Sequence, residues 1–253
     1  MTATQVARPQ PLGKRIRKSF NKWAKGRRAA IEGWLDSKSL IETTEIIPSE
    51  RFPWVAHLEA NWETIRRELD AVMPQRDAMP TMDDISPMQK MITKDKAWKV
   101  FMFRVFGAKS QENCRKCPET AKLLDSIPNC ETAFFSVLAP GAHITAHHGA
   151  YKGLVRTHLG LIVPEPNDKV RMTVGREMIH WHEGKAVVFD DTFRHEVWND
   201  TNGIRVVLLI DVERPFPPML RGINRFILRL ARTAPSISGA IKRMQSTGKP
   251  QAA

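Results

Sequence analysis

The segment GLVRTHLGLIV at residues 153–163 carries the pattern that decides the fold. Successive side chains of a β-strand point to opposite faces, so Arg156 and His158 share one face. The other face receives apolar or small residues that suit a hydrophobic core, namely Val155, Thr157, Leu159 and Leu161. The spacing therefore predicts a strand with a core on one side and charged or titratable groups on the other.

Short, largely apolar segments with a strand-like pattern recur through the middle of the chain, separated by Gly, Pro, Asn and Asp. Regularly spaced short strands with such turn residues are typical of all-β sandwiches and jelly rolls. We therefore predict a mainly β fold with flanking helices, built as a jelly roll or another β-sandwich. The other predicted strands are residues 98–107, 132–141, 169–175, 177–184, 185–190, 195–200 and 203–212.

Helical patterns flank these strands. Apolar residues near a 3.6-residue period predict an amphipathic helix in residues 12–34, a second helix over 54–73 and further helix after Pro215. Residues 74–97, rich in Pro, Met and Asp, are expected to form a loop. The predicted parts are a basic amphipathic extension at 1–40, a β domain at 41–215 with its core at 95–215, and a basic amphipathic helical extension at 216–253.

The composition describes a globular chain of 253 residues, 42% of them hydrophobic, which is enough to bury a core. No run of about 18 apolar residues occurs, so we expect no membrane span. The first residues lack the apolar region of a secretory signal, whereas their Arg-rich, acid-free composition keeps a mitochondrial presequence open. Three cysteines are too few for a disulfide-stapled secreted fold, so a reducing, cytoplasmic compartment is the expectation.

The net charge of +12 is concentrated at the two ends of the chain. Residues 1–31 hold nine Lys and Arg, residues 214–253 hold eight, and neither end holds an acid. Large apolar residues accompany these charges, which favours peripheral binding to an anionic membrane surface. Solvated charge is the plainer alternative, and the apolar stripe at 219–230 could instead pack on the β domain. No nucleic-acid reader motif is present, so nucleic acid is not an expected partner.

Seven of the eight histidines fall within residues 143–195. Burying an arginine and an imidazole side by side is costly unless an anion meets them. Arg156 and His158 therefore predict a carboxylate or phosphate ligand on their face of the strand.

The segment HEVWNDTNGIRVVLL at 195–209 makes a similar prediction. Its turn residues predict a hairpin that sets His195 opposite Arg205, and Arg205 opens an otherwise apolar strand. Histidines suited to a metal and two arginines suited to carboxylates favour a small dicarboxylate bound beside a metal. Non-haem iron oxygenases that use 2-oxoglutarate need this combination, because iron(II) takes histidine ligands on one face and keeps positions open for co-substrate and dioxygen.

Over residues 130–215 the sequence resembles the aspartyl/asparaginyl β-hydroxylase family, a group with the double-stranded β-helix form of the jelly roll. The resemblance rests on His-x-Gly at 147–149, Arg-x-His-Leu-Gly-Leu at 156–161, Phe-Asp-Asp-x-x-x-His-Glu-Val-Trp at 189–198, and an arginine ten residues after His195. It is faint from about residue 95 and absent from both basic ends.

The resemblance implies a role for each matching position. Most such oxygenases use His-x-Asp, whereas this chain has Gly149 at the aspartate position, as the animal peptide hydroxylases of the family do. Water would then take the third metal position. The implied roles are iron ligation at the catalytic centre by His147 and His195, binding of the C1 end of 2-oxoglutarate by Arg156 and His158, and binding of its distal carboxylate by Ser136 and Arg205.

The implied activity is hydroxylation of an unactivated C–H bond with dioxygen, coupled to decarboxylation of 2-oxoglutarate to succinate and CO2. The animal enzymes carry an additional arginine for an acidic substrate side chain where this chain has Leu154, which favours a lipid or acyl substrate. Gly149 favours instead the Asp or Asn residues of a peptide, as in the animal enzymes. Asp191 is expected near the substrate or behind the metal. A non-catalytic β-sandwich that binds membranes is the alternative from another class.

The remaining histidines and the paired cysteines are expected to lie outside the chemistry. Cys114 and Cys117 lack the second pair that a zinc site requires, and we expect free thiols, or an occasional disulfide. Surface or outer positions are expected for His143, His148, His180 and His182.

Overall fold

A computed structural model describes residues 30–86, 92–93 and 97–246. The chain divides into two compact units, Met1–Lys38 and Ser39–Ala253. Most of the predicted N-terminal amphipathic helix lies outside the described residues. Both β-sheets belong to the second unit.

Two helices, α2 (Pro53–Ala60) and α3 (Trp62–Val72), stand where the sequence predicts one helix over 54–73. The break falls at Asn61, where the backbone leaves the helical region with φ −111°. The Asn61 side-chain amide donates to the His57 carbonyl at 2.8 Å, which satisfies an acceptor at the end of α2. An asparagine that bonds to the nearby backbone thus ends one helix and starts the next.

The predicted loop 74–97 contains two short helices in its described part. These are η2 (Met73–Ala78) and α4 (Met82–Ile85). Thr81 caps α4, because its hydroxyl accepts from the Asp84 amide while the Asp84 carboxylate accepts from the Thr81 amide at 2.8 Å. This reciprocal capping box follows a Thr-x-x-Asp spacing that is visible in the sequence.

The described residues form two antiparallel sheets. The major sheet has seven strands in the order β1-β9-β6-β11-β4-β2-β3, and the minor sheet has four in the order β5-β10-β7-β8. Every predicted strand is present. The bounds are β1 (Ile46–Ile47), β2 (Trp98–Val105), β3 (Ala108–Lys109), β4 (Cys130–Leu138), β5 (His143–His147), β6 (Leu154–Ile162), β7 (Val170–Val174), β8 (Glu177–His180), β9 (Ala186–Phe189), β10 (His195–Asn199) and β11 (Arg205–Glu213).

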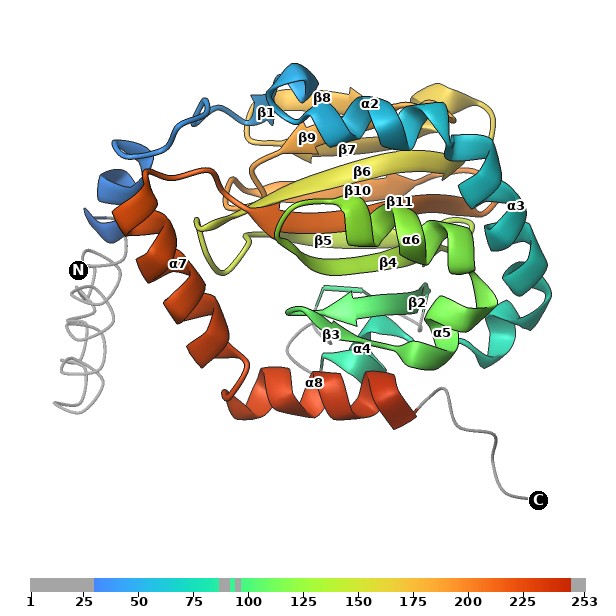
Figure 1. Ribbon diagram of the computed structural model, residues 1–253. Helices are drawn as coiled ribbons and strands as arrows, with labels where there is room; N and C mark the ends of the chain where they lie inside the picture. The colour runs from blue at the N-terminus through green and yellow to red at the C-terminus, as the bar shows by residue number, and fades with distance from the viewer. Residues whose placement is uncertain (1–29, 87–91, 94–96, 247–253) are drawn as a thin grey trace, which may run out of the picture. The chain divides into compact units, whose positions relative to one another are not determined.

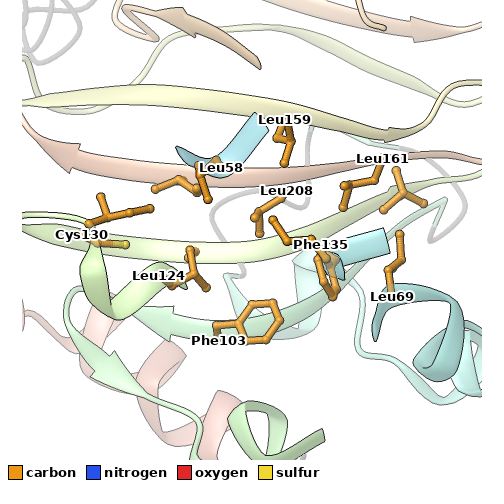
Figure 2. Packing of buried hydrophobic residues seen from close by; sticks show 14 of the residues in the cluster. Leu58, Leu69, Phe103, Leu124, Cys130, Phe135, Leu159, Leu161 and Leu208 are labelled. Carbon is orange, nitrogen blue, oxygen red and sulfur yellow. The ribbon is translucent and has the colours of Figure 1, made fainter. Parts of the chain in front are cut away.

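One hydrophobic core lies between the major sheet and the helices that cover its outer face. Figure 1 shows α2, α3 and α6 (Pro118–Ser126) on this side of the sheet. Leu58 and Leu69 from the helices belong to the same buried cluster as Leu159 and Leu208 from the strands (Figure 2). The apolar face predicted for the segment 153–163 is therefore confirmed as a core face.

A second core lies between the two sheets. Val207 and Leu209 of the major sheet belong to the same buried cluster as Met172 and Val174 of the minor sheet. Because β11 is covered on both faces, all its residues from Arg205 to Val212 are buried. Two antiparallel sheets packed face to face, with helices outside them, confirm the predicted mainly β jelly-roll fold.

The predicted hairpin across residues 199–203 is wrong. Strand β10 belongs to the minor sheet and β11 to the major sheet, so the two strands do not pair. The Asn199 side-chain amide donates to the Ala139 carbonyl at 2.9 Å and so ties the end of β10 to the end of β4. The turn residues carry the chain from one sheet to the other, and His195 and Arg205 lie on facing layers rather than on neighbouring strands.

The segment that contains Cys114 and Cys117 is helical, which the sequence analysis did not predict. Helix α5 (Gln111–Lys116) ends at Cys117, and α6 begins there. Both thiols are free, as expected. Burial raises the pKa of Cys117 to about 12, so this thiol carries almost no thiolate at neutral pH and is unsuited to redox chemistry.

Two helices follow β11, as the sequence predicts. They are α7 (Pro218–Ala231) and α8 (Pro235–Ser246). Helix α8 contributes Ala240 and Met244 to the core between the sheets. Throughout the part of the chain that the structure describes, every helix is too short or too polar to cross a bilayer.

Candidate active site

A pair of imidazoles lies on the minor sheet. His147 ends β5 and His195 begins β10, the two residues are direct cross-strand partners, and their ring centroids are 4.0 Å apart. In each ring, Nδ1 lies close to the carbonyl two residues earlier, that of Thr145 at 2.8 Å and that of Phe193 at 3.0 Å. These contacts assign Nδ1 as the donor and leave Nε2 as the ring nitrogen that can bind a metal.

The surroundings keep both imidazoles neutral. Burial lowers the pKa of His147, and burial together with the neighbouring His147 lowers the pKa of His195 to about 3. The neutral ring is the form that binds metal ions. Among residues 30–86, 92–93 and 97–246, no group of three or more His, Cys, Asp and Glu side chains converges as a metal site.

Gly149 makes room beside the pair for the carboxylate of Asp191. A Cβ atom on Gly149 would lie 2.2 Å from Asp191 Oδ1, and the Gly149 amide donates to the Asp191 carbonyl at 2.7 Å. Burial raises the pKa of Asp191 to about 6, against the lowering effect of Arg156, whose Nη1 lies 3.1 Å from the carboxylate. The carboxylate of residue 191 thus occupies the space that a side chain at position 149 would take.

Replacing Gly149 with alanine is expected to lower the free energy of unfolding by about 1–3 kcal/mol, because the new methyl group must displace the Asp191 carboxylate. Urea denaturation would measure the loss. Gly222→Ala is the matched control, because nothing lies within 4 Å of its added Cβ and the helical site should gain about 0.5–1 kcal/mol. An equal loss for Gly149→Ala in an Asp191→Ala background would show that the clash is not with this carboxylate.

The anion expected for Arg156 comes from the chain itself. Arg156 and Asp211 are partners across β6 and β11, and the guanidinium contacts the carboxylate through Nε at 2.7 Å and Nη2 at 2.9 Å. Burial lowers the pKa of Arg156, but Asp211 and Asp191 outweigh it and raise the pKa overall. Arg156 is therefore a fixed, neutralised charge that also orients Asp191.

Arg205 differs in this respect. Its side chain is 1% exposed and forms no ion pair with any described residue. Its Nη1 lies 3.4 Å from Ser136 Oγ, and its guanidinium carbon lies 4.8 Å from the centre of the Trp181 ring. Burial, with nothing to oppose it, lowers the pKa of Arg205 to about 9. Because a buried guanidinium without a counter-charge is costly, this position fits an anionic ligand.

Further unsatisfied polar atoms surround Arg205. Both ring nitrogens of His158 and the indole nitrogen of Trp181 lack a hydrogen-bond partner within the described chain. Burial, aided by Arg205, lowers the pKa of His158 well below its ordinary value, so this ring is also neutral. Ser136 Oγ accepts from the Trp98 indole at 2.9 Å, which fixes the hydroxyl near the guanidinium. Buried polar groups of this kind normally have partners, so the group fits a polar ligand.

Phe189 lies between the imidazole pair on the minor sheet and the polar group around Arg205. Its ring centroid is 4.9 Å from that of His158 on the major sheet and 6.3 Å from that of His195 on the minor sheet. The structure therefore brings the predicted metal ligands and the predicted carboxylate-binding residues to one region between the sheets. Leu154 begins β6, half-buried, on the same face of the strand as Arg156.

Several residues named in the sequence analysis lie elsewhere. Asp190, the first aspartate of the Phe-Asp-Asp motif, is fully buried and forms ion pairs with Lys152 and Arg214. These contacts hold the turn that precedes β10. The outer positions expected for the other histidines are observed, with exposed or partly exposed rings at His143, His148, His180 and His182.

Two residues of the site were not recognised from the sequence. Asp211 is the acid in the apolar run from Val206 to Val212, and its isolation there was the available signal. Trp181 lies between two exposed histidines, so alternation along the segment would have placed it facing inward. Both residues neutralise or cover an arginine of the site.

A comparison with known proteins identifies the family of this chain. Residues 59–215 match the family model described as aspartyl/asparaginyl beta-hydroxylase. The chain therefore belongs to the aspartyl/asparaginyl β-hydroxylase family and is a hydroxylase.

The share of each relative that aligns with this chain differs from one relative to the next. An ornithine lipid ester-linked acyl 2-hydroxylase of Rhizobium tropici is 41% identical over 212 residues, which are 82% of this chain and 75% of that protein. The human aspartyl/asparaginyl beta-hydroxylase is 32% identical over 166 residues, which are 64% of this chain and 21% of that protein. Among solved structures, a Pseudomonas putida prolyl-4-hydroxylase aligns with a TM-score of 0.40 and 19% identity over 61% of this chain and 88% of that chain.

Proposed function

We propose that this hydroxylase depends on Fe(II) and 2-oxoglutarate. The observation that carries the proposal is Arg205, a buried guanidinium without a carboxylate partner in the described chain, in the same region as two neutral imidazoles with Nε2 available. A dicarboxylate is the ligand that supplies the missing charge and can also reach a metal ion held by His147 and His195.

Each site residue then has a definite task. His147 and His195 would hold the iron, with their Nδ1 atoms fixed by backbone carbonyls. Arg205 and Ser136 would bind the distal carboxylate of 2-oxoglutarate. Iron, when bound, would supply the oxidation in which one dioxygen converts 2-oxoglutarate to succinate and CO2 and hydroxylates one C–H bond of the substrate.

The C1 end of 2-oxoglutarate would meet the other pair. His158 has both ring nitrogens available and can donate from one of them. Arg156 would border this end of the ligand as part of an ion-paired group, with Asp211 and Asp191 holding its guanidinium in place. Asp191, whose carboxylate fills the space beside Gly149, would be available to contact the substrate.

The substrate we propose is an acyl chain of a membrane lipid. The Rhizobium tropici relative, named for the hydroxylation of an ester-linked acyl chain, matches over three quarters of its own length. Leu154, on the same face as Arg156, presents an apolar side chain where an acidic substrate would need a cation. Asp or Asn residues of a peptide are the second candidate, and Gly149 together with the human relative favours them.

The test is product analysis with the full chain, Fe(II), 2-oxoglutarate and air. Incubation with a bacterial lipid extract is expected to yield one succinate for each lipid that gains one oxygen atom, located by fragmentation to the acyl chain. Peptides that contain Asp and Asn serve as the competing substrate, with His195→Ala as the blank. A protein that binds neither iron nor 2-oxoglutarate would contradict the proposal and favour a non-catalytic binding protein.

A further inference from the structure

Helix α7 exposes an apolar stripe. Of the nine large hydrophobic side chains that are exposed in the described chain, five lie on this helix. Their exposed fractions reach 80% at Met219 and 65% at Phe226. The five are Met219, Ile223, Phe226, Ile227 and Leu230, which recur at the spacing of one helix face. Packing on the β domain, the alternative for the apolar residues of 219–230, therefore holds for Leu220 and Leu228 but not for these five.

The opposite face of α7 is anchored to the domain. Leu220, Asn224 and Leu228 are buried. The Asn224 amide donates to the Gly153 carbonyl at 3.1 Å, and its oxygen accepts from the Tyr151 hydroxyl at 2.7 Å. These bonds fix the rotation of the helix about its own axis, so the apolar stripe on the opposite face points to solvent.

The anchor also connects α7 to the site. Tyr151 and Gly153 belong to the loop between β5, which ends at His147, and β6, which carries Arg156 and His158. The side chain of Asn224 lies so close to this loop that a Cβ on Gly153 would be 2.1 Å from its oxygen. The buried face of helix α7 is therefore in direct contact with the loop, and Figure 1 shows α7 following β11 down one side of the second unit.

Positive charge flanks the stripe. Arg221 and Arg229 are exposed and form no ion pair with described residues, while Arg225 pairs with Glu213 and Arg232 with Glu131. No acid follows Glu213 in the sequence. The surface therefore presents bare apolar side chains bordered by unneutralised arginines.

We propose that α7 docks the protein on an anionic membrane surface, with the helix lying in the plane of the lipid headgroups. Exposed apolar groups enter the headgroup boundary, and the flanking arginines meet lipid phosphates. A second copy of this chain fits poorly, because a symmetric contact of α7 with itself would oppose arginines with arginines and offer no acid. Docking would hold the β5–β6 loop behind α7, one helix diameter (~10 Å) from the headgroups. This deepens the lipid assignment under the proposed function without depending on catalysis.

Cosedimentation of the full chain with vesicles tests the proposal without iron or 2-oxoglutarate. Vesicles of phosphatidylcholine with about three tenths phosphatidylglycerol are expected to bind the protein, and vesicles of phosphatidylcholine alone to bind it weakly. Arg221→Gln with Arg229→Gln is expected to lower the partition constant roughly 25-fold, about fivefold for each charge. Ile223→Asp with Phe226→Asp is expected to lower it more than about 100-fold.

The β7–β8 hairpin supplies matched controls. Met178→Asp changes another exposed apolar side chain, 52% exposed, and Arg176→Gln removes another exposed charge. Both should bind vesicles as the unchanged chain does, and all variants should keep its melting temperature. Undiminished binding by the α7 variants would assign adsorption to other basic regions and overturn the proposal. A dimer in solution that Phe226→Asp dissociates would overturn it in favour of a second copy.

Discussion

Replacing Arg205 with methionine is expected to leave the ligand-free protein at least as stable as the unchanged chain while it abolishes the response to 2-oxoglutarate. The reason is the environment of the guanidinium, which is 1% exposed and forms no ion pair with described residues. A buried charge that lacks its counter-charge costs stability, and an apolar side chain of similar volume removes that cost. Binding of the dicarboxylate, by contrast, loses a charge-assisted contact.

Thermal unfolding with and without 2-oxoglutarate measures both effects. At a ligand concentration about 100-fold above the dissociation constant, the unchanged chain should gain roughly 2.7 kcal/mol, or about 5–10 °C in melting temperature. Arg205→Met should show no gain. Arg156→Met is the matched control, because Arg156 is already paired with Asp211 and its loss should cost about 3–5 kcal/mol without any ligand. If Arg205→Met unfolded as readily as Arg156→Met, Arg205 would have a structural role and the site assignment would fail.

Replacing His195 with alanine is expected to lower turnover by at least about 10³-fold, because several kcal/mol of metal-dependent stabilisation disappear with the iron. His147→Ala should behave alike, since the two rings are cross-strand partners with equivalent Nδ1 contacts. Iron content after dialysis, measured beside succinate formation, would separate the loss of metal from the loss of fold.

His143→Ala is the matched control for this pair. His143 begins β5, four residues before His147, but its Nε2 contacts Glu196 at 2.8 Å and its ring is partly exposed. Its removal should leave iron content and turnover within about twofold, as for an ordinary surface change. Retention of iron by both His147→Ala and His195→Ala would place the metal elsewhere.

The sequence predicted the strands and the faces of the strands well, because those depend on local alternation. In β6, the division between Arg156 and His158 on one side and Leu159 and Leu161 on the other is the division between the two cores. The helices that follow Pro215 were also predicted from their period. These features need no knowledge of which elements become neighbours.

Non-local pairing limited the rest. The turn after Asn199 has the composition of a hairpin, and only its bond to the Ala139 carbonyl reveals that it connects two sheets. The sequence pattern predicts burial for both Arg156 and Arg205. In the structure Arg156 pairs with Asp211 across the sheet, whereas Arg205 pairs with no acid among the described residues. Which arginine awaits a ligand depends on cross-strand register, which the sequence alone does not state.

The crossing of the chain from β10 in one sheet to β11 in the other has a consequence for the stability of the protein. His195 lies on the minor sheet and Arg205 on the major sheet, so a ligand that contacts both residues links the two sheets. Amide hydrogens of both sheets should then exchange more slowly when this ligand is bound. Resistance of the protein to proteolysis should therefore rise when the proposed dicarboxylate is bound.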